Sequence, residues 1–347
     1  MNSQINELRK DQLAQWVMSV ICGADPEVKD KEIPLALQSI GGDAGFRHYY
    51  RIQLPDETLV AVNAPVETED NHTFVHIAEA WRQGGVRVPE VKAVDYINGF
   101  MLLEDFGDTQ LQSVLSDQNV DLWCQKAFAT LKTIQQQSPE SLLVYDGSLL
   151  HFELSIYSEW FLGDLLGLNT VISDLTALFS HLVETILQQP IGTVHRDFHS
   201  RNLMVVDQNE LGVIDFQGAL YGPLLYDSVS LLKDCYVRWP DEKINTWLQS
   251  FVSSHALLQQ YDFEQVRQWF DLTGLQRHLK CLGIFSRLWL RDGKSGYLAD
   301  IPRTFDYVIE VCRHYPELQH HALWLERHVQ PILQQRLNAV QVEAGVI

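Results

Sequence analysis

Short segments rich in apolar residues recur in the first third of the chain and are bounded by turn residues, which is typical of strands. Glycine, proline and the hairpin-forming pair Asn98-Gly99 separate these segments. The pattern therefore predicts a small antiparallel sheet. Its expected strands are residues 35–40, 46–52, 58–62, 86–94 and 100–104.

Apolar residues recur at helical spacing at the N-terminus and throughout the rest of the chain. Leu8, Leu13, Trp16, Val17 and Val20 fall near one face of a first amphipathic helix. We expect an α+β fold of two lobes, with a small β-rich lobe at 1–107 and a larger helical lobe at 108–347. Further helices are expected at residues 69–83, 119–137, 153–166, 171–189, 239–255, 263–290, 303–315 and 318–337.

The stretch from residue 193 to 216 carries the strongest chemical signal. His195, Asp197 and Asn202 have the spacing of the kinase catalytic loop, and a predicted hairpin then leads to Asp215-Phe216. Asp197 would orient the acceptor hydroxyl and accept its proton, while Asn202 and Asp215 offer the hard oxygen ligands that Mg²⁺ prefers. The alternative is that these residues only cap a strand and form turns, and the combined spacing argues against it.

The glycine-rich stretch after the first strand suits the phosphates of a nucleotide, because glycine lets the backbone approach closely. The third strand has Asn63 where kinases carry a phosphate-pairing lysine. Arg47 and Arg51, four residues apart on one strand face, could supply the missing charge, or they could be solvated edge charges. A hinge to the second lobe is expected near Glu104 and Phe106. The glycine-rich candidates are Gly42, Asp43, Ala44, Gly45 and Phe46.

Composition limits the classes of partner. Lys and Arg total 26 against 45 Asp and Glu, and the resulting net charge of −19 argues against nucleic acid and anionic membranes. The five cysteines are scattered, which indicates reduced thiols in a cytoplasmic protein. No apolar run approaches the ~18 residues of a membrane span.

These motifs resemble the aminoglycoside phosphotransferase and choline kinase superfamily and, more narrowly, the bacterial anomeric amino-sugar kinases. The resemblance implies a bilobal protein-kinase-like fold that uses ATP and Mg²⁺. It also implies phosphorylation of the C1 hydroxyl of N-acetylmuramate or N-acetylglucosamine in cell-wall recycling, with Asp227 holding the catalytic-loop backbone. That family has an acidic residue where this chain has Asn63. The matching segments are residues 42–47, 50–51, 64–65, 69–70, 103–108, 195–204, 282–287 and 291–294.

Two rival functions follow from the same residues. The acidic net charge would suit a cationic aminoglycoside or choline, and Asn63 would suit a nucleotide-binding pseudokinase without activity. Arg287 and Arg291 argue against the cationic substrate, because they favour an acceptor with a carboxylate unless they form a solvated helix face. His199 is a further residue that could bind the acceptor. We expect a monomer whose partners are ATP and a small amino sugar.

Overall fold

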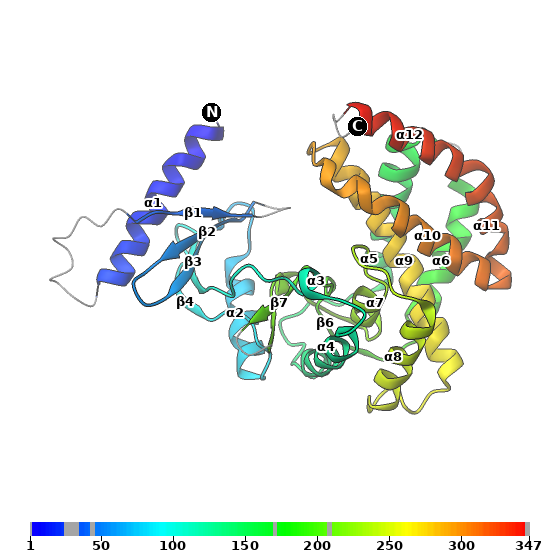
Figure 1. Cartoon of the computed structure of the whole chain (residues 1–347), viewed down its shortest axis with the longest axis horizontal. Coiled ribbons are helices and arrows are strands. Elements are labelled where there is room, and N and C mark those ends of the chain that lie inside the picture. Colours follow the sequence, from blue (N-terminus) through cyan, green and yellow to red (C-terminus); the bar gives the residue numbers. More distant parts are fainter. Residues whose placement is uncertain (1, 24–34, 42–45, 169–171, 207–209, 344–347) are drawn as a thin grey trace. The chain divides into compact units, whose positions relative to one another are not determined.

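The computed structural model describes residues 2–23, 35–41, 46–168, 172–206 and 210–343 (Figure 1). The chain divides into two compact units: Met1–Val114 with Asn202–Gln217, and Leu115–Arg201 with Gly218–Ile347. The predicted boundary was residue 107, with all of 108–347 in the second lobe. The observed division differs because the hairpin after Asn202 bonds to the first unit, with Val205 N donating to Thr109 O and Val213 N to Arg87 O, both at 2.8 Å.

The first unit is built on an antiparallel sheet of five strands in the order β1-β2-β3-β5-β4, and the predicted antiparallel sheet is confirmed. The expected strand 86–94 is shorter, because Pro89 has no N–H to donate and Val86 N bonds instead to Trp81 O at the end of a helix. The elements of this unit are α1 (Asn2–Cys22), β1 (Gln38–Ile40), β2 (His48–Gln53), β3 (Thr58–Asn63), α2 (Asn71–Gln83), β4 (Val91–Asp95), β5 (Phe100–Glu104), α3 (Leu111–Val114), β7 (Leu203–Val206) and β8 (Glu210–Val213).

Helix α1 covers one face of this sheet. Its Leu13 and Val17 are fully buried and pack in one cluster with side chains of β2 and β3. Leu8, which the sequence placed on the same apolar face, is 60% exposed. The buried partners from the sheet are Tyr50, Ile52, Leu59, Ala61, Phe100 and Leu102.

Helices dominate the second unit, and the long helix α9 runs through its core (Figure 1). A Cβ on Gly283 of α9 would lie 2.5 Å from Ile156 O, so only glycine permits this approach to the helix that the sequence placed at 153–166. The elements are α4 (Val120–Gln135), α5 (Gly147–Ile156), the π-helix η2 (Tyr157–Leu165), α6 (Ile172–Ile186), β6 (Ile191–Val194), β9 (Leu220–Pro223), α7 (Tyr226–Leu232), α8 (Asp241–Ser253), α9 (Phe263–Leu290), η5 (Ser295–Asp300), α10 (Ile301–His314), η6 (Pro316–Leu318), α11 (Gln319–Trp324), η7 (Leu325–Val329) and α12 (Gln330–Glu343).

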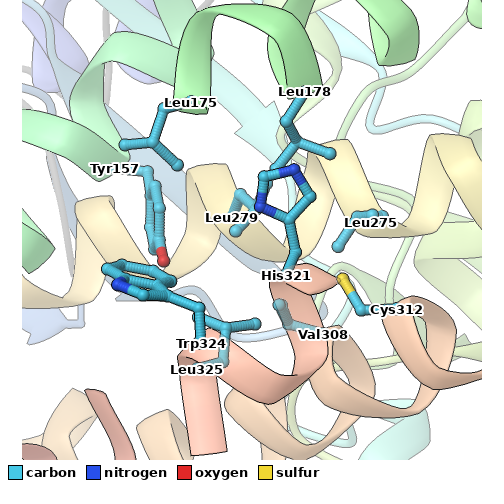
Figure 2. A pocket seen from close by; sticks show the side chains of 10 residues that line it. All are labelled: Tyr157, Leu175, Leu178, Leu275, Leu279, Val308, Cys312, His321, Trp324 and Leu325. Atoms are coloured by element: carbon cyan, nitrogen blue, oxygen red, sulfur yellow. The ribbon is translucent and has the colours of Figure 1, made fainter. Parts of the chain in front are cut away.

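The second unit also contains a small apolar cavity among α6, α9, α10 and α11 (Figure 2). Its volume of about 10 Å³ is close to the least that can hold one water molecule. The ring of Tyr157 and the imidazole of His321 reach it among leucine and valine side chains. It is a packing gap, too small for a sugar or a nucleotide. None of the helices in the described ranges is long and apolar enough to cross a membrane.

Candidate active site

The β7–β8 hairpin of the first unit brings the two predicted metal ligands together. Asn202 precedes β7 and Asp215 follows β8, and Ile214 N donates to Asn202 O at 3.0 Å. The Asn202 Nδ2 atom lies 3.4 Å from Asp215 Oδ2. The hairpin that the sequence predicted between these residues is confirmed, and it explains why a separation of 13 residues becomes a direct contact.

Asp215 holds a strained backbone conformation. Its φ of 64° lies in the left-handed region, which non-glycine residues adopt at a cost. Gln217 Nε2 donates to its Oδ1 at 2.7 Å. The next residue, Phe216, is buried against Phe74 and Trp81 of α2, with centroid distances of 4.9 and 6.0 Å. This anchoring keeps the Asp215 carboxylate at the surface despite the strain.

This pair fits a magnesium ion by donor chemistry. Mg²⁺ binds through one or two protein oxygens and completes its shell with water and nucleotide phosphates. Asp215 has an exposed carboxylate, and the neighbouring Asn202 amide, whose Nδ2 faces Asp215 Oδ2 here, also carries an oxygen of the kind that Mg²⁺ binds. Together these two side chains would hold the ion.

The side chain of Asn63 contacts the first helix. Its side chain is 1% exposed, and its Oδ1 accepts hydrogen bonds from Arg9 Nε at 2.9 Å and Arg9 Nη2 at 2.7 Å. Residues two apart in a strand share a face, so Asn63 lies with Ala61 on the face that α1 covers. The side chain therefore bonds to α1 and does not stand in for a phosphate-pairing lysine.

The opposite face of the sheet carries Tyr49, which the sequence analysis missed. Burial raises the pKa of Tyr49 to about 12, against the opposing charge of Arg47, and the carboxylates of Asp215 and Glu69 add to the rise. Tyr49 is therefore close to Asp215, one of the two predicted metal ligands. The alternation of buried Tyr50 and Ile52 with their neighbours could have assigned it to this face.

The two arginines proposed for the nucleotide phosphates both have carboxylate partners. Arg47 forms an ion pair with Glu69 at 3.0 Å and lies over the Phe74 ring, and its side chain is 8% exposed. Arg51 donates to Asp105 from Nε at 2.6 Å and to Asp108 from Nη1 at 2.7 Å. Each arginine thus fixes local structure, and their contact with phosphates stays a prediction.

Near the expected hinge, the side chains of Glu104 and Phe106 both contact Arg87. Hydrogen bonds from Arg87, one of them 2.7 Å long, hold the pKa of the Glu104 carboxyl below its usual value. Phe106 lies under the Arg87 guanidinium at 4.6 Å and against Gly212 of β8, where a Cβ would come within 2.5 Å of the ring. Phe46 is 61% exposed, whereas Gly42, Asp43, Ala44 and Gly45 lie outside the described residues.

The catalytic loop of the second unit is fixed by two buried carboxylates. At its start, Asp227 accepts hydrogen bonds from His195 N at 2.6 Å and Arg196 N at 2.9 Å, which is the expected role. Arg196 has a φ of 76°, so Asp227 holds the loop in a strained turn directly before Asp197. Near its end, Asp234 accepts from Ser200 N at 2.9 Å and Ser200 Oγ at 2.5 Å, a contact that the sequence analysis missed.

Cations surround Asp197. Burial opposes ionisation of its carboxyl, but Lys280, His199 and Arg277 overcome that effect and hold the pKa of Asp197 well below its usual value. Lys280 Nζ forms an ion pair with Glu153 Oε1 at 2.8 Å, and Glu153 is buried, with 2% of its surface exposed. These charges favour the ionised form of the Asp197 carboxyl, and its role toward an acceptor hydroxyl stays a prediction.

The predicted acceptor residues lie in two places. His199, in the catalytic loop, meets the Tyr236 ring edge to face at 5.1 Å. Arg287 and Arg291 lie one turn apart at the end of α9. Arg291 is 56% exposed and bonds to Asp292 at 2.7 Å, whereas the buried Nε of Arg287 has no hydrogen-bond partner in the described part of the chain.

Comparison with known proteins identifies the family. The model of the "Phosphotransferase enzyme family" matches residues 36–269, which is more than half of the chain. The protein belongs to the phosphotransferase enzyme family. This phosphotransferase is 37% identical over 292 residues to an N-acetylmuramate/N-acetylglucosamine kinase of Pseudomonas aeruginosa, a match that covers 82% of this chain and 86% of that one.

Other relatives carry the same name. The kinase of Pseudomonas putida is 35% identical over 321 residues, covering 90% of this chain and 94% of its own. That of Neisseria meningitidis serogroup B is 34% identical over 325 residues, covering 89% and 93%.

Solved structures confirm the predicted fold. A choline/ethanolamine kinase family protein from Mesorhizobium loti matches this phosphotransferase with a TM-score of 0.58 at 14% identity, covering 90% of this chain and 98% of that one. The choline kinase LicA from Streptococcus pneumoniae matches with a TM-score of 0.57 at 11% identity, covering 85% and 99%. At such identities the likeness shows the kinase-like α+β fold alone.

Proposed function

We propose that this phosphotransferase uses Mg²⁺-ATP to phosphorylate the C1 hydroxyl of N-acetylmuramate and N-acetylglucosamine. The observation that carries the proposal is the 34–37% identity, over 82–90% of the chain, to three bacterial kinases that are named for these two sugars. The product would be a sugar 1-phosphate, which suits the reuse of cell-wall sugars.

The chemistry follows from the catalytic loop. The ionised Asp197 would accept the proton of the C1 hydroxyl as its oxygen attacks the γ-phosphorus. A new oxygen–phosphorus bond would form, the bond to the bridging oxygen of ADP would break, and ADP would leave. Asn202 and Asp215 would hold Mg²⁺, which neutralises charge on the phosphates. Asp227 and Asp234 keep the loop in place during this step.

The rival functions have less support. Choline kinases share the fold at low identity, and the net charge of −19 remains compatible with a cationic substrate such as choline or an aminoglycoside. A pseudokinase was suggested by Asn63, and the 34–37% identity to relatives that are named kinases argues against it.

A panel assay with labelled ATP tests the proposal. N-acetylmuramate, N-acetylglucosamine, choline and an aminoglycoside would each be offered with Mg²⁺, and an Asp197→Asn variant would serve as the control. We expect turnover of the two amino sugars by the natural enzyme and a loss of orders of magnitude in the variant. Turnover of choline or the aminoglycoside alone would overturn the substrate assignment.

A further inference from the structure

Arg201 lies in the catalytic loop, four residues after Asp197, and the phosphoryl-transfer step described above does not use it. Its guanidinium carbon is 3.6 Å from the centroid of the Tyr236 ring, which is the separation of flat groups in direct contact. A guanidinium stacked in this way keeps its N–H bonds in its own plane, where they can form a fork with a carboxylate. The side chain is 32% exposed, so a small molecule can reach it.

The stacked pair is held in place by Asp234. This carboxylate, 1% exposed, accepts from Ser200 N directly before Arg201 and, through Oδ1, from Tyr236 N at 2.8 Å. One buried group therefore fixes both the backbone that carries the arginine and the backbone that carries the ring. A site fixed in advance loses little conformational entropy when a ligand binds.

The surroundings of the pair suit a sugar with an acidic substituent. His199 and Phe285 pack around Tyr236 at centroid distances of 5.1 and 6.3 Å, and they provide an aromatic wall. Asp300 Oδ2 lies 3.8 Å from Arg201 Nη2, beyond hydrogen-bonding distance, while its Oδ1 accepts from Arg303 at 3.1 Å. Asp300 thus orients the Arg201 guanidinium by charge from one side.

We propose that Arg201, stacked on Tyr236, binds the carboxylate of the acceptor and so distinguishes an acidic amino sugar from a neutral one. This inference rests on the proposed function, in which N-acetylmuramate carries a lactyl carboxylate and N-acetylglucosamine does not. Arg287 is the competing cation. It lies seven residues beyond Lys280 on α9, about 10 Å along the helix axis, whereas Arg201 shares a loop with Asp197.

The test measures kcat/KM for both sugars with the natural enzyme and with Arg201→Gln, which replaces the guanidinium with a shorter, neutral amide. Loss of a charge-assisted hydrogen bond should lower the ratio of N-acetylmuramate to N-acetylglucosamine by about ten- to a hundredfold, mainly through KM for N-acetylmuramate. Because both sugars are measured with the same preparation, the ratio does not depend on the fraction of folded protein. Arg201→Lys should give an intermediate ratio, since lysine keeps the charge but not the fork.

A third acceptor separates charge from shape. The lactyl amide of N-acetylmuramate has the same shape without the charge, and Arg201→Gln should lower its kcat/KM far less than that of the acid. Arg313→Gln is the matched control, because Arg313 is 63% exposed and pairs with Glu326. It should leave the ratio unchanged.

The outcomes are distinct. An equal loss on both sugars would mean that Arg201 acts on the nucleotide or the fold, and it would overturn the inference. So would an unchanged ratio in Arg201→Gln, or a ratio that falls only in Arg287→Gln or Arg291→Gln. If the natural enzyme phosphorylates neither sugar, the proposed function itself fails.

Discussion

Arg9 of α1 donates two hydrogen bonds to the buried side-chain oxygen of Asn63 on β3, at 2.9 and 2.7 Å. Arg9 Nη2 also donates to Asn98 O at 2.7 Å, and its guanidinium lies over the Phe100 ring. Through these contacts Arg9 ties the first helix to three neighbouring parts of the sheet. Asn63 therefore contributes to the stability of the first unit.

Asn63→Ala should lower the free energy of unfolding by about 1–3 kcal/mol, because it leaves a partly buried guanidinium without its acceptor. Denaturant titration of Arg9→Ala, Asn63→Ala and the double variant should give a coupling energy of about 1 kcal/mol or more. The KM for ATP of the folded variant should stay within about twofold. A large rise in that KM with unchanged stability would return Asn63 to the nucleotide site.

Asp215→Ala and Asp215→Gly should both abolish Mg²⁺-dependent ATP binding, since each removes the carboxylate that would hold the ion. They should differ in stability. Glycine adopts a φ of 64° freely, whereas alanine pays about 1–2 kcal/mol there, so the glycine variant should be the more stable by that amount. Calorimetric titration with Mg²⁺-ATP checks the loss of binding, and thermal unfolding checks the difference in stability. Retained binding in either variant would count against the metal assignment.

Asp227 should make stability fall as pH rises. Burial raises its pKa to about 6, above the value of about 4 in an unfolded chain, so the folded state holds the proton more tightly. The stabilisation is complete below pH ~4 and is lost as pH rises through ~6, by on the order of 2–3 kcal/mol. Asp227→Asn does not titrate. Unfolding measured from pH 4 to 7 should therefore show the natural protein losing stability relative to this variant, and a constant difference would refute the prediction.

Gly212→Ala should disturb the packing of the β7–β8 hairpin, which carries the predicted metal ligands at its ends, on Phe106. A methyl group there would come within 2.5 Å of the ring, closer than side chains approach, so Phe106 or the strand must move. We expect a loss of about 1–3 kcal/mol in unfolding free energy together with weaker Mg²⁺-ATP binding. In Gly212→Ala/Phe106→Leu the smaller side chain should restore much of both. If the second substitution restores neither, this packing is not what positions the hairpin.

The strands of the sheet and the β7–β8 hairpin could be predicted from the sequence, because turn residues mark the ends of these apolar segments and the spacing fixes their contacts. Strand β9 could not, since Gly218, Gly222 and Pro223 read as a loop, and only pairing with β6 makes residues 220–223 extended. The orientation of the Asn63 side chain also could not be predicted. Nearly every residue of β3 is buried, so no alternation shows which side chains face α1.

The supports of the catalytic loop were harder to find than the loop itself. Asp234 follows Lys233 in the sequence and looks like part of a solvated charge pair, yet it is buried and bonds to Ser200, 34 residues earlier. Glu153 likewise forms ion pairs with Arg196 and Lys280, which lie far from it in the sequence. Such contacts depend on tertiary packing, which one sequence does not encode in any local pattern.

The position of the phosphate on the product tests the central claim most directly. The enzyme would be incubated with Mg²⁺-ATP and N-acetylglucosamine, with Asp197→Asn as the control, and the product examined by ³¹P–¹H correlation NMR. We expect a phosphorus coupled to the anomeric proton with the natural enzyme and no product with the variant. A phosphorus coupled to the protons of C6, or an equal yield from Asp197→Asn, would contradict it.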